Sequence, residues 1–514
     1  MALLGFLIAF PLLVAIALMA FRKDSVRDPL VIGSAAVIGV ASVACAVTFM
    51  GNPSTFAMTP EMSLAGNYVA VAVDLFLCGL VFALSIAYRN GVMFAMSFVQ
   101  LLVSIWCGSF ALHPEDAMAE PMYIDNLSVI MVLIVGLVGS AICIYALGYM
   151  KDFQHHEDEA ARRAGTAAAD RRHQFIALMF LFLSAMFIIV TSDNMDWLVA
   201  GWEITTVCSF LMIGYTRTPE ARKSAILQIN LNMIGGLAFH IALVYMHVVG
   251  VPLSINGMVE VAGGAQSAQL VIPLMMLSIA GLTKAAQMPF HRWLLGAMVA
   301  PTPTSALLHS STMVKAGVFL LVKMAPLYLL YPVASAMVVG IGGITFVLCS
   351  FMAISQSNAK RVLAYSTIAN LGLISACAGV GTSEAVWAAI FLIIFHTVSK
   401  SVLFLCVGTV EHRIGSRNIE DMDRFMMLGI MGMFVAPFGM LISKWATLVS
   451  FAETGNVVFL ILLAFGSAAT FFFWAKWLGK LAGVSQKAEN VEGGVHRTEW
   501  TAIGFISALL IGCC

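Results

Sequence analysis

The stretch KAAQMPFHRWLLGAMVAPTPTSALLHSSTMVK, residues 284–315, places titratable groups inside an otherwise apolar part of the chain. Lys284, His309 and Lys315 lie in or beside hydrophobic segments. A lysine at bilayer depth costs about 2.5–3.5 kcal/mol on insertion scales, so such a residue generally serves a function. Prolines are expected to break the helices here, and broken helices are tolerated where backbone lines a cavity or packs on protein; they are Pro289, Pro301 and Pro303. The stretch therefore indicates an ion pathway.

The composition is that of a membrane protein. Of 514 residues, 61% are hydrophobic and only 11% are charged, too few to cover the surface of a soluble protein of this size. The net charge of zero gives no indication of nucleic-acid binding. The ten cysteines contain no C-x-x-C pair and mostly lie in apolar runs, so neither zinc nor an iron–sulfur cluster is implied.

Apolar segments long enough to cross a bilayer recur along the whole chain. They predict an all-α polytopic protein with fifteen spans, near 2–21, 30–50, 68–88, 91–112, 124–149, 174–192, 195–215, 224–250, 269–288, 304–324, 331–355, 362–381, 384–410, 425–451 and 454–483. A sixteenth segment, 499–514, is too short to span, which favours truncation of a longer polypeptide. The first segment has no cleavage site after it and is expected to be a span rather than a signal peptide.

The basic residues predict the topology. Four lysines lie inside spans and Lys323 ends one, where its side chain is expected to snorkel to the headgroups. All other Lys and Arg residues fall in odd-numbered connections, whereas even connections such as 51–67 and 113–123 hold none. The positive-inside rule then puts the odd connections in the cytoplasm and the N-terminus outside. The longest polar connection, 150–173, is expected to be a solvated loop, and GIGG at 340–343 indicates close helix packing.

Few residues within the spans could carry chemistry. His396 and Lys400, four apart, project from one helix face, and Glu203 is the one clearly central acid. The candidates are Glu203, Lys284, His309, Lys315, His396, Lys400 and Lys444, the last lying seven residues beyond Pro437. Asp74 is also mid-span but has no evident partner. A row of lysines and histidines suits proton exchange, whereas a sodium site needs clustered carboxylates and carbonyl oxygens.

Five motifs resemble one known family. They are WE at 202–203, KAAQMPFHRW at 284–293, PTPTSALLHSSTMVKAG at 301–317, KRVLAYST at 360–367 and HTVSKSVLFL at 396–405, while YIDNLSVIM at 123–131 resembles the start of the family's N-terminal module. Together they look like the antiporter-like membrane subunits shared by respiratory complex I, energy-converting NiFe hydrogenases and Mrp-type Na⁺/H⁺ antiporters. The likeness covers roughly residues 120–450.

The resemblance implies two inverted five-helix repeats within 121–450, each with a broken helix, here those bearing Lys284 and Lys444. Residues 1–120 and 451–514 would be flanking helices. It also implies that Glu203 pairs with Lys284 as a switch between neighbouring subunits. The midplane hydrophilic axis would consist of His309, Lys315, His396 and Lys400, with Lys444 where protons leave or enter.

In its sequence details, the chain most resembles the large membrane subunit of Ech-type or formate-hydrogenlyase-type hydrogenases. Four spans precede the YIDNLS segment where complex I's longest such subunit has two, Leu392 stands where a histidine is common, and Gly235-Gly236 replace an acidic residue. The resemblance implies a multi-pass subunit of the cell membrane, without a redox centre of its own, beside partner subunits that hold NiFe and iron–sulfur centres. A Mrp-type Na⁺/H⁺ antiporter subunit is the alternative; a purely structural scaffold would not need so many buried ionisable groups.

Overall fold

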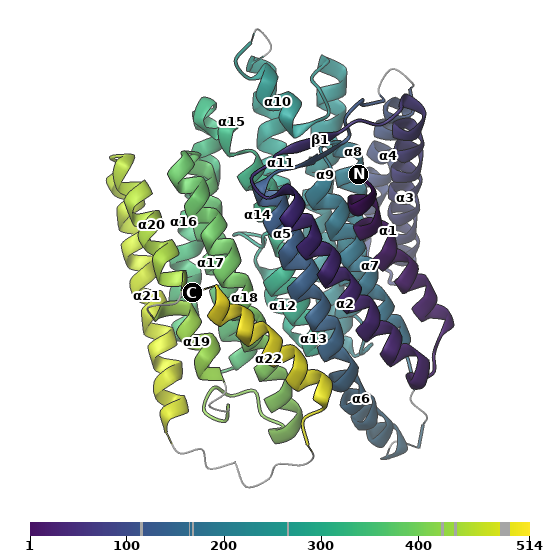
Figure 1. Ribbon diagram of the computed structural model, residues 1–514, viewed down its shortest axis with the longest axis vertical. Coiled ribbons are helices and arrows are strands. Elements are labelled where there is room, and N and C mark those ends of the chain that lie inside the picture. Colours follow the sequence, from purple (N-terminus) through teal and green to yellow (C-terminus); the bar gives the residue numbers. More distant parts are fainter. Residues whose placement is uncertain are drawn as a thin grey trace.

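Long helices run side by side along the bundle in the computed structural model (Figure 1), which describes residues 1–113, 117–163, 165–166, 169–264, 267–422, 426–435, 439–483 and 494–513. Within them, fourteen helices are long and apolar enough to cross a membrane, and the shorter helix 268–284 makes a fifteenth segment. All fifteen coincide with the predicted spans, and the expected stub at the end is α22 (Arg497–Gly512). The chain is an all-α polytopic membrane protein.

The N-terminal half begins with four helices at one edge of the bundle (Figure 1), followed by one continuous helix that contains a π-helical turn. The four helices are α1 (Ala2–Ala20), α2 (Asp24–Phe49), α3 (Pro60–Ala87) and α4 (Gly91–Ala111). The continuous helix comprises α5 (Asn126–Leu133), the π turn η2 (Ile134–Gly139) and α6 (Ser140–Arg163). It is followed by α7 (Arg172–Thr191), α8 (Met195–Ile213) and α9 (Pro219–Val249). Because α6 continues to Arg163, most of the predicted loop at 150–173 is helix, which corrects that expectation.

The central part of the chain is made of short, interrupted helices. They are α10 (Ile255–Val261), η3 (Ser267–Leu270), α11 (Val271–Lys284), α12 (Arg292–Gly296), η4 (Ala297–Val299), α13 (Thr302–Ala306), the π turn η5 (Leu307–Ser311), α14 (Met313–Lys323) and α15 (Ala325–Leu330). The break after Lys284 is the one predicted. Pro301 and Pro303, by contrast, lie at the start of α13, where proline is compatible with a helix. That helix is interrupted instead at its π turn and at Thr312.

The last long helices of the C-terminal half lie at the opposite edge of the bundle, and α22 then packs over α6 and α18 (Figure 1). Its helices are α16 (Pro332–Ile354), α17 (Ala359–Val380), α18 (Ser383–Ile414), α19 (Met426–Phe434), α20 (Gly439–Glu453) and α21 (Val457–Ala482). Pro437, predicted to break the helix before Lys444, lies outside the described residues. The predicted close packing at GIGG is confirmed: a Cβ on Gly342 of α16 would lie 2.6 Å from the Gly372 carbonyl oxygen of α17.

Side-chain caps start many of these helices. The Thr59 hydroxyl accepts a hydrogen bond from the Met62 amide, and Thr218 caps α9 in the same way, each before a proline that suits the first helical turn. Asp125 caps α5 and also receives the Lys323 ammonium at 2.7 Å. The acid at the start of α5 therefore pairs with the lysine at the end of α14, and the snorkelling of Lys323 to the headgroups stays a prediction.

Contacts between the connections support the predicted alternation of sides. The strands β1 (Ser54–Phe56) and β2 (Met122–Ile124) pair antiparallel, with Thr55 opposite Tyr123, and join two even-numbered connections. Isolated bridges link further even connections through Met122 with Ser192 and Asn194 with Ser254. These connections therefore gather at one end of the bundle.

Burial shows which helices are central. The apolar windows of α17 and of the segment 302–323 are 100% buried inside the protein, against 33% for α1, α3 and α21. The outer helices turn large hydrophobic side chains outward, as lipid contact requires. The titratable residues of α14, α17 and α18 consequently lie in the most enclosed part of the bundle.

Candidate functional site

Lys284 ends α11 and reaches across to α8. Its Nζ donates to the Trp202 carbonyl oxygen at 2.5 Å and to Thr206 Oγ1 at 3.1 Å, and it lies 4.2 Å from the centre of the Trp202 ring. Because α11 stops here, the lysine sits at a helix end inside the bundle, with a carbonyl, a hydroxyl and an aromatic face around the ammonium. These partners can hold the charged form without a direct counter-ion.

Glu203 contacts a different set of helices. Its Oε1 accepts a hydrogen bond from Gln100 Nε2 of α4 at 3.1 Å. A Cβ on Gly236 of α9 would lie 2.3 Å from the same oxygen, so only glycine leaves room for the carboxylate. Among the described residues, Glu203 and Lys284 do not form the direct ion pair that the resemblance implied. Lys284 instead donates to Trp202 and Thr206, which lie near Glu203 on α8.

The α11 break lies close to α14. A Cβ on Gly317 would come within 2.5 Å of both the Ala285 amide nitrogen and the Gly281 carbonyl oxygen. Gly281 of α11 and Gly317 of α14 thus allow the backbones of the two helices to touch. Gly281 lies three residues before Lys284, and Gly317 lies two residues after Lys315. The lysines are therefore held on adjoining helices at similar depth.

Lys315 and His396 form the next contact. Lys315 Nζ and His396 Nδ1 are 2.9 Å apart, which joins α14 to α18. In the described part of the chain, His396 Nε2 and both ring nitrogens of His309 have no hydrogen-bond partner, although all are buried. His309 belongs to the π turn η5, and its ring lies 5.0 Å from that of Phe404. The π turn, a geometry frequent at functional sites, was not predicted from the sequence.

Lys400 lies one turn beyond His396 on α18. Its Nζ donates to the Leu363 carbonyl oxygen at 3.1 Å and to Ser366 Oγ, both on α17, and lies 4.9 Å from the Trp474 ring centre on α21. The structure thus brings the four predicted axis residues onto three neighbouring elements. His309 lies on η5, Lys315 on α14, and His396 and Lys400 on α18.

Lys444 stands apart from this cluster. It is half-buried on α20 and lines a shallow apolar groove, with Trp445 of the same helix and Leu463 of α21. No hydrogen bond among the described residues connects it to Lys400. Lys444 therefore lies outside the central cluster, near the outer helices.

A second buried cluster was missed by the sequence analysis. Asp74 of α3 does have a partner: its Oδ2 lies 3.1 Å from His240 Nε2 of α9, and the same nitrogen is 3.1 Å from Ser104 Oγ of α4. His240 Nδ1 bonds to the Gly236 carbonyl oxygen at 2.8 Å. Histidine at mid-helix was the available signal, but the 166 residues that separate it from Asp74 hid the pairing.

The cluster adjoins Glu203. A cavity of about 10 Å³, enough for about one water, is lined by Cys78, Ser97, Gln100 and Glu203. Cys78 in turn contacts Asp74 and Ser104, at 3.9 and 3.4 Å. Polar groups therefore continue from Glu203 into the pair α3–α4.

Two groups of residues could hold a metal ion on geometric grounds. They are His155, His156 and Glu159 on exposed α6, and Asp152, His496 and Glu499 between α6 and α22. In the second group, His496 already bonds to Asp152 at 2.7 Å and Glu499 accepts from Thr409 at 2.8 Å. Exposed acidic groups such as the first are common without a metal, whereas Glu499 of the second group is buried. Neither group adjoins the buried cluster.

Comparison with known proteins places the chain in a family. Residues 192–472 match the family described as NADH:quinone oxidoreductase/Mrp antiporter, transmembrane, and residues 120–162 match the N-terminal module of chain 5 of NADH-ubiquinone oxidoreductase (complex I). Relatives named antiporter subunit mnhA2 in Staphylococcus aureus strains MRSA252 and USA300 are 32% and 33% identical over 406 and 364 residues. These alignments cover 70% and 65% of this chain but 48% and 43% of the relatives, so the chain spans about half their length.

Two solved structures share the fold. A chain of the membrane-bound sulfane sulfur reductase, an archaeal respiratory membrane complex, superposes with a TM-score of 0.76 at 18% identity, over 99% of this chain and 93% of that one. A chain of the Mrp complex from Dietzia sp. DQ12-45-1b gives a TM-score of 0.67 at 26% identity, over 88% and 50%. The chain belongs to the NADH:quinone oxidoreductase/Mrp antiporter family of membrane proteins, as an antiporter-like subunit.

Proposed function

We propose that this subunit translocates protons through its buried row of titratable side chains, within a redox-driven membrane complex. The observation that carries the proposal is the order of these groups across the bundle. The row runs through Asp74 and His240, Glu203, Lys284, Lys315, His396, His309 and Lys400, with Lys444 as its outer end. Neutralising or removing one of these side chains should interrupt proton transfer along the row.

The contacts within the row suit stepwise exchange. Lys315 and His396 are in direct hydrogen-bond contact, so a proton can pass between an ammonium and an imidazole without an intermediary. Lys284 and Glu203 bond to neighbouring residues of α8, so a rearrangement of one side chain can bring the two charges together. Proton transfer between them would then be coupled to movement of the broken helix end.

Buried polar atoms support hydration of the central part. Besides the histidine nitrogens, Ser305 Oγ, Ser311 Oγ and Ser399 Oγ have no protein partner within the described residues. Buried polar groups are nearly always hydrogen-bonded, and water supplies the bond where protein does not. Water between η5 and α18 would connect His309 to His396.

The ligand chemistry favours protons over sodium. Sodium requires a shell of oxygen ligands, as other hard cations do. The row offers two buried carboxylates, and Asp74 is already engaged by His240. Nitrogen bases dominate the rest of it. A proton is the cation that such groups bind.

We assign the subunit to an energy-converting hydrogenase of the Ech or formate-hydrogenlyase type, or to a complex I-like assembly. Its partners would be other membrane subunits and a peripheral arm holding NiFe and iron–sulfur centres, while this chain would hold no cofactor. It would reside in the cytoplasmic membrane with its N-terminus outside, because basic residues collect in the odd-numbered connections.

A subunit of a Mrp-type Na⁺/H⁺ antiporter is the second candidate. It is favoured by the relatives named as antiporter subunits, which are 32–33% identical. Metal analysis of the copurified complex separates the candidates: nickel and iron support the hydrogenase, and their absence from a pure, transport-active assembly supports the antiporter.

Lys284→Ala tests the proposal. The substitution replaces a titrating group at a helix end by a small apolar side chain, so the complex should assemble but lose coupled proton transport. Reconstituted complex is assayed for acidification of proteoliposomes, with Lys323→Ala as a control for loss of a partly buried, ion-paired lysine outside the row. Wild-type acidification rates with Lys284→Ala would remove this lysine from the pathway and refute the proposal.

A further inference from the structure

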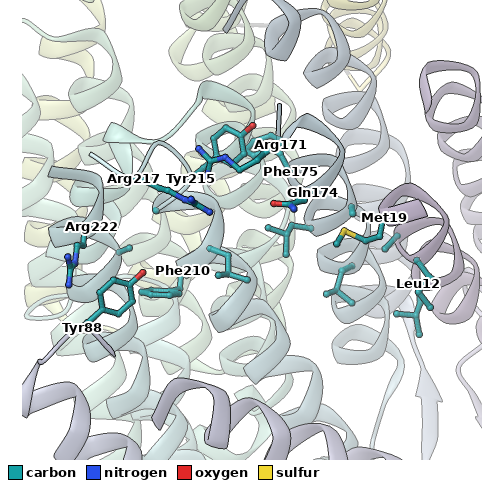
Figure 2. Close-up of a pocket in the computed structure, with 18 residues that line it drawn as sticks. Leu12, Met19, Tyr88, Arg171, Gln174, Phe175, Phe210, Tyr215, Arg217 and Arg222 are labelled. Carbon is teal, nitrogen blue, oxygen red and sulfur yellow. The ribbon is translucent and has the colours of Figure 1, made fainter. Parts of the chain in front are cut away.

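A pocket lies away from the buried row, at the ends of five helices (Figure 2). It has a volume of about 840 Å³ and is formed by the C-terminal ends of α1, α3 and α8 and the N-terminal ends of α7 and α9. All five ends flank odd-numbered connections, the side of the bundle that carries the basic residues. The pocket therefore lies at one face of the membrane.

The pocket has an apolar part and a basic part. In Figure 2, Leu12 and Met19 of α1 lie at one end and Arg222 with Tyr88 at the other, with Arg217, Tyr215 and Arg171 between them. Leu178, Leu181 and Leu211 extend the apolar wall. An apolar trough open at the surface of a membrane helix bundle suits a hydrocarbon chain.

The basic part carries three arginines. No acidic residue lines the pocket, and in the described part of the chain Arg171, Arg217 and Arg222 have no ion pair. On the same side, Arg27, Arg172 and Arg417 each pair with an acid. Arg171 lies 5.0 Å from the ring centre of Tyr215, and Arg222 lies 4.5 Å from that of Tyr88. Aromatic faces thus hold the guanidinium groups of Arg171 and Arg222, and a stacked guanidinium keeps its N–H donors for an anion.

We propose that this pocket binds an anionic phospholipid of the adjacent leaflet. Its acidic headgroup would lie among the three arginines, whose guanidinium groups match phosphate geometry, and an acyl chain would lie along α1 and α7. Basic pockets between membrane helices bind acidic headgroups in this way. Because α8 carries both Glu203 and the pocket residue Phe210, and α9 carries both Gly236 and Arg222, the lipid would brace the two helices that hold the Glu203 carboxylate.

The test compares lipid retention by the intact complex in native mass spectrometry, after exchange into phosphatidylglycerol or phosphatidylcholine. We expect retained phosphatidylglycerol on the wild type, and a loss of affinity on the order of a hundredfold when Arg171, Arg217 and Arg222 are all changed to Gln. A matched triple variant removes the same charge from exposed residues on the same side outside the pocket: Arg22, Lys23 and Arg162 to Gln. It should retain the lipid.

Three outcomes would overturn the proposal. Equal loss in both triple variants would mean that only the overall surface charge matters. Retention of phosphatidylcholine equal to that of phosphatidylglycerol would mean that the arginines do not select an anionic headgroup. Displacement of the lipid by millimolar inorganic phosphate alone would assign the basic part to a soluble anion. Ile16→Trp offers a charge-neutral check, because it narrows the apolar trough and should reduce retention while leaving the arginines in place.

Discussion

His240 Nε2 lies 3.1 Å from Asp74 Oδ2, and this contact joins the early helix α3 to α9, a helix that also supplies the glycine beneath Glu203. Both side chains are more than nine-tenths buried. The pair α3–α4 therefore contributes an acid, a serine and a glutamine to the region around Glu203, within one chain. The buried row thus extends beyond the motifs recognised in the sequence.

Asp74→Asn should show whether the Asp74–His240 pair takes part in proton transfer or only stabilises the fold. Breaking a buried ion pair on one side costs about 3–5 kcal/mol, because the remaining charge loses its partner, whereas removing both charges costs less. We expect the double variant Asp74→Asn/His240→Gln to regain most of the thermal stability lost in the single variant. Proton transport should remain low in both, measured in proteoliposomes.

Recovery of transport together with stability in the double variant would show that the pair only holds α3 against α9. If transport is normal in both variants while Lys284→Ala abolishes it, the proton pathway stands and ends at Glu203. The comparison therefore tests this extension independently of the pathway itself.

Glu203→Gln should lower redox turnover and proton transport together. The substitution keeps the size of the side chain and its capacity to accept from Gln100, but removes the central carboxylate beside Lys284. If catalysis in the partner subunits is tightly coupled to the row, electrons cannot flow when proton movement stops. Turnover and acidification are measured on the same preparation; full turnover with full coupling would exclude Glu203 from the mechanism.

Gly236→Ala tests the geometry around the same carboxylate. The added Cβ would lie 2.3 Å from Glu203 Oε1 and 3.0 Å from Gln100 Nε2, so the carboxylate and its Gln100 partner must move away from α9. We expect transport to fall toward the level of Glu203→Gln. Gly79→Ala is the matched control, because nothing lies within 4 Å of the Cβ it adds in α3. Equal activity of the two variants would mean that the position of Glu203 is not critical.

Hydrophobicity and the prolines sufficed to predict the spans and the break at Lys284, because both depend on local sequence. The resemblance put Lys315, His396 and Lys400 in one axis; in the structure Lys315 contacts His396, and Lys400 lies one turn further along α18, bonded to α17. It also implied direct pairing of Glu203 with Lys284, which the structure lacks because Trp202 and Thr206 receive the ammonium. That choice depends on side-chain rotamers, which spacing along the chain does not determine.

The Asp74–His240 pair could not be predicted for a different reason. It depends on how α3 and α4 pack on α9, and those two helices lie outside the segment that carries the family motifs. Similarly, the π turn at His309 arises in a helix that begins with two prolines and must fit against α18. Long-range packing decides both features, and no single segment of sequence encodes it.

Transport should not require sodium. The row contains four lysines and three histidines against two buried acids, and one of these acids, Asp74, already has His240 at 3.1 Å. A hard cation would need several oxygens at short distance, and replacing an imidazole partner by a metal shell would leave His240 without its acid. Reconstituted complex should therefore build a pH gradient in sodium-free potassium buffer, and a protonophore should collapse it. A strict sodium requirement, with uptake of radiolabelled sodium that a protonophore does not affect, would instead favour the antiporter.

In that case we expect the sodium ion among the oxygen groups around Glu203 and Asp74. Asp74→Asn should then weaken the sodium dependence of transport. The control is Asp28→Asn, which changes a surface ion pair with Lys151 and should leave the sodium dependence unchanged.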